Sequence, residues 1–178
     1  AAAGTLESVN LADPANTRMM NARPMTLSLA DIRTYVSGFD HVKSHILGIF
    51  ERGSNTLIGF WEVYVDWSHR EYLLNILIGE HGDEPLYPRA ETQRVLFASF
   101  FGELELDTMR CSVLATNTRV LALFAARGIV HEHSSKKPSA VGGAPVEILH
   151  FSVKRETWAT MRAARLVLYD NLVGLEVL

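Results

Sequence analysis

The chain is poor in cysteine, in lysine and in long apolar runs. Its single cysteine, Cys111, cannot form a disulfide within the chain, which favours a reducing compartment. Lysine is scarce beside arginine, and a net charge of −3 does not match the basic surface of a nucleic-acid binder. No stretch reaches the ~20 apolar residues that span a bilayer, and residues 1–4 lack the features of a signal peptide. We therefore expect a cytoplasmic protein with neither a nucleic-acid nor a membrane partner.

The composition is that of one folded domain. Apolar residues make up 48% of the 178 residues and charged residues 21%, which is enough to fill a core without the polar bias of a disordered chain. The sequence has no internal repeat and no low-complexity linker. We therefore assign residues 1–178 to a single domain with an apolar C-terminal tail, residues 166–178.

The first half of the chain predicts a strand, two helical segments and then a three-stranded meander. The meander rests on β-branched and aromatic residues interrupted by turn residues at 52–55 and at Ser68-His69. The helix before it has apolar residues at helical spacing, with Thr26 or Ser28 as its N-cap. The expected elements are a strand at 5–11, helical residues at 13–21, a helix at 26–39, and strands at 45–51, 56–67 and 70–79.

The second half predicts alternating helices and strands. Pro88 suits the first turn of a helix, and Gly128 suits the left-handed residue that ends one. The expected elements are a helix at 88–101, a strand at 109–115, a helix at 118–127, a hairpin of 129–135 with 146–153, and a helix at 156–168. A strand–helix–strand unit between residues 73 and 115 makes two strands parallel. The fold class is therefore α/β (α+β), with a mixed, mostly antiparallel sheet flanked by helices.

One motif carries a resemblance to a known family. Asn117 is followed by Phe124 seven residues later and by Gly128-Ile129 at eleven and twelve. This spacing resembles the Asn…Tyr/Phe…Gly-Phe pattern of the GNAT superfamily of N-acetyltransferases. Further segments resemble the ribosomal-protein-alanine acetyltransferase branch: residues 75–80 its central strand, 57–60 the strand before it, and 147–158 its closing strand and helix. The resemblance covers about residues 56–162.

The resemblance implies acetyl-CoA as cosubstrate and a primary amine as acceptor. The cofactor would lie between strands 75–79 and 109–115, with backbone groups of residues 76–78 paired to its pantetheine arm. The family's glycine-rich pyrophosphate loop is degenerate here, since Tyr87 and Arg89 align with its two glycines and Pro88 has no N–H. The implied cofactor-binding residues are Ile76, Leu77, Ile78, Tyr87, Arg89, Ala90, Asn117 and Phe124.

Two interpretations of that loop stay open. In one, Arg89 supplies a charge-assisted contact to the pyrophosphate and acetyl-CoA still binds. In the other, the site has decayed and the fold serves as a non-catalytic binding or assembly module. Each of Asn117 and Gly128 also has a structural explanation, as a helix N-cap and a helix stop.

The usual catalytic groups are missing. The tyrosine that often protonates the leaving thiolate is Phe124 here, and the acid expected two residues before Asn75 is Leu73. From the residues themselves, the catalytic candidates are Glu62, Glu71 and Asn75. If the turn at Ser68-His69 sets the register so that Glu62 lies opposite Asn75, the two share a face, whereas a slip of one separates them. A solvated strand face or edge is the alternative explanation for these acids. The candidates for lining the amine side are Trp61, Tyr64, Trp67 and Tyr72, some of which are expected in the core instead.

Two further features have alternative explanations. His131 and His133 are expected on the same side of a strand, but no third ligand is evident and we expect no metal. In the tail after Arg165, nine of thirteen residues are Leu, Val or Tyr, which is more apolar surface than a monomer usually exposes. The tail either folds back onto its own sheet or forms a homodimer through Leu172, Val173, Leu175 and Val177.

Overall fold

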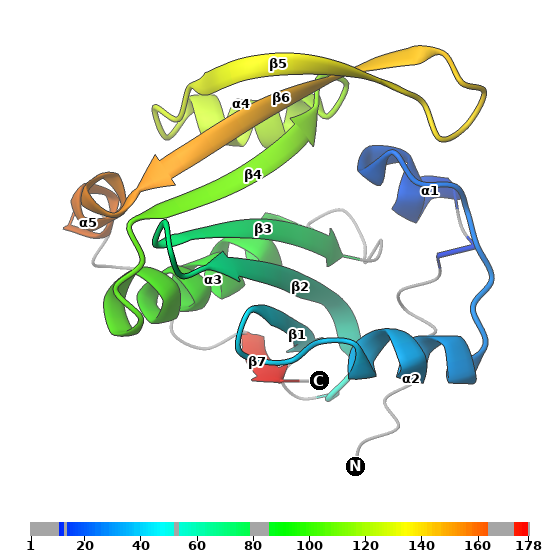
Figure 1. Ribbon diagram of the computed structural model, residues 1–178, viewed down its shortest axis with the longest axis horizontal. Helices are drawn as coiled ribbons and strands as arrows, with labels where there is room; N and C mark the ends of the chain where they lie inside the picture. Colours follow the sequence, from blue (N-terminus) through cyan, green and yellow to red (C-terminus); the bar gives the residue numbers. More distant parts are fainter. Residues whose placement is uncertain (1–10, 13, 52–53, 79–85, 164–172, 178) are drawn as a thin grey trace.

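The computed structural model describes residues 11–12, 14–51, 54–78, 86–163 and 173–177, and its centre is a twisted mixed sheet (Figure 1). Within these residues seven strands pair in the order β5-β6-β4-β3-β2-β1-β7. Their bounds are β1 (Ser44–Glu51), β2 (Leu57–Asp66), β3 (Glu71–Ile78), β4 (Thr108–Leu114), β5 (His131–Pro138), β6 (Pro145–Lys154) and β7 (Val173–Val177). Among these seven described strands, only β3 and β4 pair in parallel. The predicted fold class, the meander and the hairpin are confirmed.

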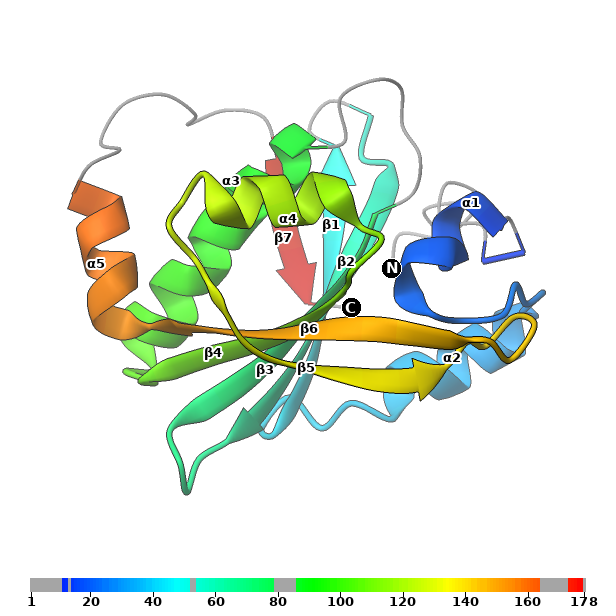
Figure 2. The ribbon, with the colours of Figure 1, turned by 90° about the horizontal axis from the view of Figure 1, so that it is seen from above.

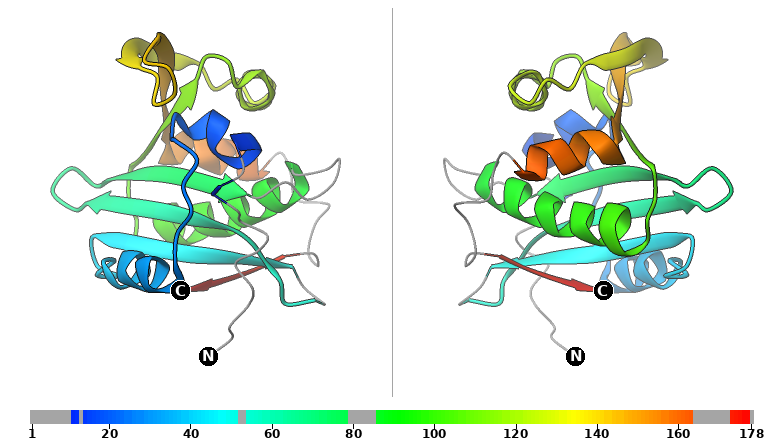
Figure 3. Two further views of the ribbon diagram at one scale, coloured as in Figure 1. Left: turned by 90° about the vertical axis from the view of Figure 1, so that its right-hand side faces the viewer. Right: turned by 90° about the vertical axis from the view of Figure 1, so that its left-hand side faces the viewer.

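Helices lie on both sides of this sheet. They are α1 (Pro14–Thr17) with a 3-10 turn at Arg18–Met20, α2 (Leu29–Ser37), α3 (Leu86–Phe97) continued by a π-helical turn at Ala98–Glu103, α4 (Thr118–Ala125) and α5 (Arg155–Ala163). Helices α3 and α4 cover one face, whereas α2 lies on the opposite side (Figures 2 and 3). We call the face away from α3 and α4 the front face.

Strand alternation separates the core from the front face. Trp61, Val63 and Val65 of β2 and Tyr72 and Leu74 of β3 are buried against the α3 side. Each such side chain stabilises the fold by about 1.5–3 kcal/mol through its removal from water. The residues between them on β2 and β3 point to the front face and are partly exposed. Trp61 donates from Nε1 to Oγ1 of Thr92 on α3 at 2.9 Å, which fixes this helix against the sheet.

Local end signals set the helix boundaries. Ser28 caps α2, since its hydroxyl accepts from the backbone N–H of Asp31 and the Asp31 carboxylate accepts from that of Ser28. Asn117 caps α4 by accepting from the N–H of Val120 at 3.3 Å. Gly128 follows α4 with φ of +68°, the left-handed conformation expected at a helix stop.

The chain before α2 is tied to the distant β5–β6 hairpin. The Asn21 side chain donates to the carbonyl of Pro138 at 3.2 Å and accepts from the N–H of Ala140 at 2.8 Å. Nε of Arg23 donates to the Ala140 carbonyl at 2.6 Å. Seen from its right-hand side, the molecule shows this segment running from the hairpin down to α2 (Figure 3). Sequence patterns gave no sign of this link, because it joins residues more than 100 positions apart.

The predictions for the two ends of the chain are tested only in part. The strand expected at 5–11 and the end of the helix expected at 156–168 lie largely outside the described residues. The described part of the tail forms β7, which pairs antiparallel with β1 of its own chain from Leu47↔Val177 to Glu51↔Val173. This pairing corresponds to the folded-back alternative. The dimer contact stays a prediction, and Leu172 lies outside the described residues.

Candidate active site

The parallel strands β3 and β4 separate after a short ladder. Their register runs only from Glu71↔Thr108 to Leu73↔Arg110. Beyond this point β3 stays paired with β2 as far as Ile78↔Gly59, and β4 stays paired with β6 as far as Leu114↔Ile148. Figure 1 shows the two strands diverging toward the right-hand side. The described strands therefore leave backbone groups of the second half of β3 without a strand partner on the β4 side, inside the sheet, where such groups need one.

Three predicted cofactor-binding residues lie on this free edge. Ile76 and Ile78 are half-buried and Leu77 is buried, and all three are paired only with β2. A strand edge of this kind suits an extended ligand that supplies its own donors and acceptors. Their backbone contacts to a pantetheine arm stay a prediction.

Asn117 and Phe124 lie beyond the end of β4, and both have structural roles. Asn117 is the cap of α4 described above. Phe124 is buried, and its ring packs edge-to-face on Phe151 with centroids 4.8 Å apart. Their roles toward a cofactor stay predictions.

The predicted pyrophosphate contacts are less well defined. Residues 79–85, which follow β3, lie outside the described residues. Tyr87, Arg89 and Ala90 fall in the first turns of α3, which begins at Leu86. Their side chains are not among those described, so the contact assigned to Arg89 also stays a prediction.

Beyond Leu73↔Arg110 the strands β3 and β4 are no longer paired, and we call the space between them the gap. A group of polar side chains around the Glu62 carboxylate, the Glu62 cluster, lies on the front face beside it. Glu62 pairs with Asn75 across β2 and β3, which confirms the register expected from the Ser68-His69 turn. One oxygen of Glu62 accepts a short hydrogen bond from the Tyr35 hydroxyl of α2. The other oxygen accepts from the Tyr64 hydroxyl and from Nδ2 of Asn75, each at 3.4 Å. The structure therefore brings together two of the three catalytic candidates, and it adds two phenols.

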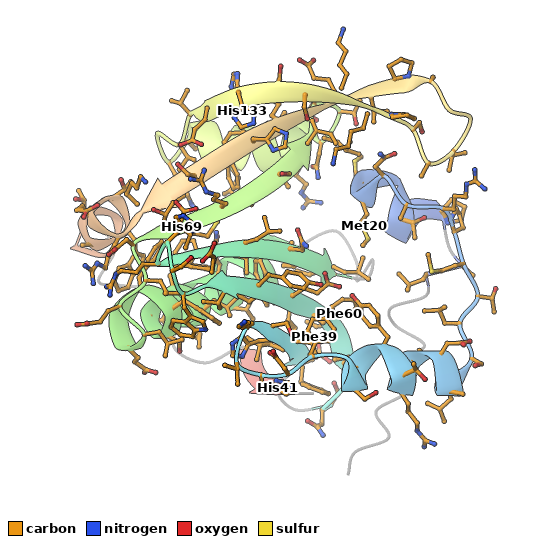
Figure 4. The ribbon with its side chains drawn as sticks, in the orientation of Figure 1. Met20, Phe39, His41, Phe60, His69 and His133 are labelled. Carbon is orange, nitrogen blue, oxygen red and sulfur yellow. The ribbon has the colours of Figure 1, made fainter. Side chains whose placement is uncertain are left out.

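The electrostatics of this cluster favour a cation. Burial and the Glu62 carboxylate raise the pKa of Tyr35, and the same two causes raise the pKa of Tyr64. Both phenols therefore stay protonated and act as donors to Glu62 at neutral pH. Phe39 packs against both rings, at 5.4 Å from Tyr35 and 6.0 Å from Tyr64. Figure 4 labels Phe39 and Phe60 beside strands β1 and β2. A carboxylate rimmed by aromatic rings is a suitable place for an ammonium group.

Glu71, the third catalytic candidate, lies elsewhere. It is four residues from Asn75 along β3, a separation of roughly 13 Å. Its carboxylate accepts two hydrogen bonds from Arg110 of β4, at 2.6 and 2.9 Å, and Arg110 also contacts Glu132 of β5 at 3.3 Å. The Arg110 guanidinium holds the pKa of Glu71 below its usual range, against the opposing effect of burial. Glu71 is therefore held as an ion-pair partner and is not placed with Glu62.

The Glu71–Arg110 pair gives a pH-dependent contribution to stability. A carboxyl whose pKa is lowered on folding stabilises the protein above its unfolded pKa and loses that effect as pH falls through the folded pKa. We expect Glu71→Gln to destabilise the protein by about 0.2–1 kcal/mol at pH 7, as for exposed ion pairs, and by less at pH 3. A double-mutant cycle with Arg110→Gln in urea, run at both pH values, measures the pair energy. A pair energy that is unchanged at pH 3 would contradict the assignment.

The structure decides which of the four candidate aromatic residues lie on this face and which lie in the core. Trp61 and Tyr72 do not line the amine side, because strand alternation directs both into the core, where they are buried. Trp67 is exposed and donates to the Val42 carbonyl at 3.0 Å, so Tyr64 alone of the four aromatic residues belongs to the Glu62 cluster. Tyr35 was not predicted. Its only signal is its place beside the apolar stripe of the helix predicted at 26–39.

The expected alignment of His131 with His133 is wrong. A register shift between these residues sets His131 opposite Phe151 but His133 opposite His150. Since neighbouring residues of β6 point to opposite faces, the bulge separates the two imidazoles. Among the described residues, no group of three or more His, Cys, Asp and Glu side chains is arranged to hold a metal ion.

The splayed parallel pair, inside a mostly antiparallel sheet with helices on both faces, defines the GNAT acetyltransferase fold. A GNAT-family acetyltransferase from Bacillus anthracis matches with a TM-score of 0.66 and 16% identity, over 84% of this chain and 89% of the other. Spermidine N-acetyltransferase from Vibrio cholerae, in complex with CoA and spermine, matches with a TM-score of 0.74 and 15% identity, over 89% and 95%. At these identities the likeness establishes the fold.

Comparison at the sequence level gives no match. No protein-family model matches the chain, and no curated protein matches it in sequence. In the part of the chain that the structure describes, no helix is long and apolar enough to cross a membrane.

Proposed function

We propose that the protein transfers an acetyl group from acetyl-CoA to a primary amine of a small molecule or protein. The observation that carries the proposal is the coincidence of two features: the free edge of β3 at the gap, and the Glu62 cluster on the front face beside it. The first feature suits an extended amide-bearing ligand, and the second suits an ammonium group. A thioester in the gap would therefore meet an amine at its front opening.

The residues of the chain would divide the work as follows. Backbone groups of Ile76, Leu77 and Ile78 would hold the pantetheine arm, and the bound cosubstrate supplies the acetyl thioester. Glu62 would hold the incoming ammonium, while Tyr35, Tyr64 and Asn75 keep its carboxylate in place. Positioning of this kind converts a bimolecular encounter into a reaction within one complex. Phe124 is buried and has no acidic group, so the thiolate must take its proton from another source.

The solved structures that share this fold support this chemistry. The V. cholerae enzyme is described in complex with CoA and spermine, which are a coenzyme A species and a cationic amine. The front-face carboxylate of this chain is consistent with an acceptor of the same charge. The particular amine is not defined by this likeness.

A second candidate function is a non-catalytic GNAT-fold binding or assembly module. The observation that favours it is the absence of glycines from residues 84–91, where Pro88 also removes one backbone donor. The buried phenylalanine at position 124 agrees with it. Under this alternative the Glu62 cluster would bind a cationic partner without turnover.

Acetyl-CoA is expected to raise the melting temperature of the full chain. A ligand at 100 times its dissociation constant adds about 2.7 kcal/mol, which corresponds to roughly 5–11 °C for a domain of this size. Arg89→Ala is expected to weaken binding by about 1.5–3 kcal/mol, the contribution of a hydrogen bond to a charged group. Differential scanning fluorimetry with acetyl-CoA, and with acetate plus adenosine as a control, measures both effects.

The outcomes separate the two candidate functions. A shift with acetyl-CoA, followed by release of free CoA in a screen of primary amines, supports the transferase. A shift without CoA release from any amine supports the binding module. The absence of a shift and of calorimetric heat at millimolar acetyl-CoA would contradict acetyl-CoA binding.

A further inference from the structure

A hydrogen-bonded chain of three side chains crosses the front face from the sheet edge toward the gap. The Nδ1 atom of His150 on β6 lies 3.0 Å from Oγ of Ser112 on β4. Its Nε2 atom lies 2.7 Å from Oγ of Ser135 on β5. Both ring nitrogens are therefore bonded to hydroxyl groups. His133, which Figure 4 labels on β5, stacks on the His150 ring with centroids 4.4 Å apart.

The chain ends at the front opening of the gap. The parallel register stops at Leu73↔Arg110, and Asn75 and Ser112 each lie two residues beyond it on their own strand. Side chains two apart on a strand share a face, so Asn75 and Ser112 lie on opposite sides of the opening and both point forward. Asn75 is bonded to Glu62, and Ser112 is bonded to His150. An amine that extends from Glu62 past Asn75 into the opening would therefore approach Ser112.

The surroundings of His150 keep its ring neutral. Burial lowers the pKa of His150, and the charges of His133 and Lys137 on β5 act in the same direction. Among the described residues, the neighbouring charged groups on this face include Arg110 of β4, which is bonded to both Glu132 of β5 and Glu71 of β3. A neutral imidazole that donates from Nε2 to Ser135 has a free electron pair on Nδ1 toward Ser112, which suits a proton acceptor.

We propose that His150 is the general base of the acetyl transfer and that Ser112 passes the proton to it; this rests on the proposed function. The ammonium nitrogen gives a proton, directly or through one water, to Oγ of Ser112 as the hydroxyl proton moves to Nδ1 of His150. The freed electron pair then forms the C–N bond, and the C–S bond breaks. The second proton of the nitrogen goes to the leaving thiolate. The proton on His150 leaves through Ser135 to solvent, so an ammonium and acetyl-CoA give an acetamide, CoA and one proton.

The arrangement assigns different kinetic roles to the two sides of the gap. Glu62 holds the amine and affects its binding. His150 accepts the proton and affects the chemical step. Ser112 is a relay, and Ser135 connects the ring to the edge of the sheet.

The test compares the full chain with the variants His150→Ala, Ser112→Ala and Ser135→Ala, with His131→Ala as the matched control. His131→Ala removes an imidazole from the same strand β5, but the bulge sets this residue opposite Phe151 and away from His150. We expect His150→Ala to lower kcat about 100-fold, the lower end of the range for general-base catalysis. The KM for acetyl-CoA and the KM for the amine should change little. Ser112→Ala is expected to resemble it, Ser135→Ala to have a smaller effect, and His131→Ala to keep wild-type kcat.

Two readouts distinguish a base from a structural residue. Added imidazole should restore part of the kcat of His150→Ala, and the low-pH limb of the wild-type kcat/KM profile should disappear in this variant. A folded His150→Ala with wild-type kcat, or a loss that imidazole does not restore, would overturn the inference while leaving the proposed function intact. A wild-type chain that binds acetyl-CoA but acetylates no amine would instead overturn the proposed function itself.

Discussion

Replacing Glu62 by glutamine is expected to lower kcat/KM for the amine by about 10- to 100-fold, mainly through a higher KM. The change keeps the size of the side chain and one acceptor oxygen, but it removes the negative charge and replaces the second acceptor with an NH2 group. A hydrogen bond to a charged group contributes about 1.5–3 kcal/mol, which corresponds to this range. Steady-state kinetics with an amine identified in the CoA-release screen measures it.

Glu71→Gln is the matched control for this experiment. It makes the same chemical change on the neighbouring strand β3 and on the same face of the sheet. Glu71, however, is paired with Arg110 and lies away from the Glu62 cluster. Its KM for the amine should stay within about twofold of wild type, since removal of an exposed ion pair has only a small effect. Equal losses in the two variants would mean that the overall charge of the face, rather than the Glu62 cluster, attracts the amine.

Gly59→Ala is expected to lower the free energy of unfolding by about 3 kcal/mol, the upper part of the range for overpacking. Gly59 lies on β2 opposite Ile78, where β3 borders the gap. A Cβ at this position would collide with the carbonyl oxygen of Leu77 and lie 3.0 Å from Cα of Ile78. Both are backbone atoms, so β3 itself would have to move. The variant should therefore also weaken acetyl-CoA binding if the edge of β3 holds the cofactor.

Gly102→Ala is expected to change the free energy of unfolding in the opposite direction. Gly102 lies in the π-helical turn after α3, and a Cβ there would meet only the Trp158 ring at 3.7 Å, an ordinary van der Waals contact. The substitution should stabilise the protein by about 0.4–1 kcal/mol because it restricts the unfolded chain. Urea denaturation of both variants gives the two values. A Gly59→Ala protein as stable as wild type would show that β2 and β3 separate easily at this point.

Some of the site could be predicted because local signals determine it. The turn around Ser68-His69, residues 67–70, fixes the register of the hairpin, and alternation then brings Glu62 opposite Asn75. The caps at Ser28 and Asn117 and the left-handed Gly128 depend on neighbouring residues only. These features need no knowledge of distant parts of the chain.

The rest of the site depends on contacts that local patterns do not carry. Tyr35 reaches Glu62 because α2 packs on the front face, across 27 residues of sequence. Ser112, Ser135 and His150 meet because β6 lies between β4 and β5, and the bulge that orients His133 toward His150 has no sequence signature of its own. The faces of Trp61 and Tyr72 were open to either assignment, since aromatic residues occur in both cores and binding sites.

The short ladder between β3 and β4 divides the sheet into two sub-sheets. One sub-sheet is β7-β1-β2-β3 and the other is β4-β6-β5, and the three residue pairs of the ladder join them. The segment from Asn21 to Tyr35 connects the two sub-sheets, because Asn21 is bonded to the β5–β6 hairpin and Tyr35 to β2. A rotation that widened the opening between β3 and β4 would therefore strain the hydrogen bonds at the two ends of this segment. Glu62, the carboxylate proposed to hold the amine, is thus also the point at which this segment is attached to β2.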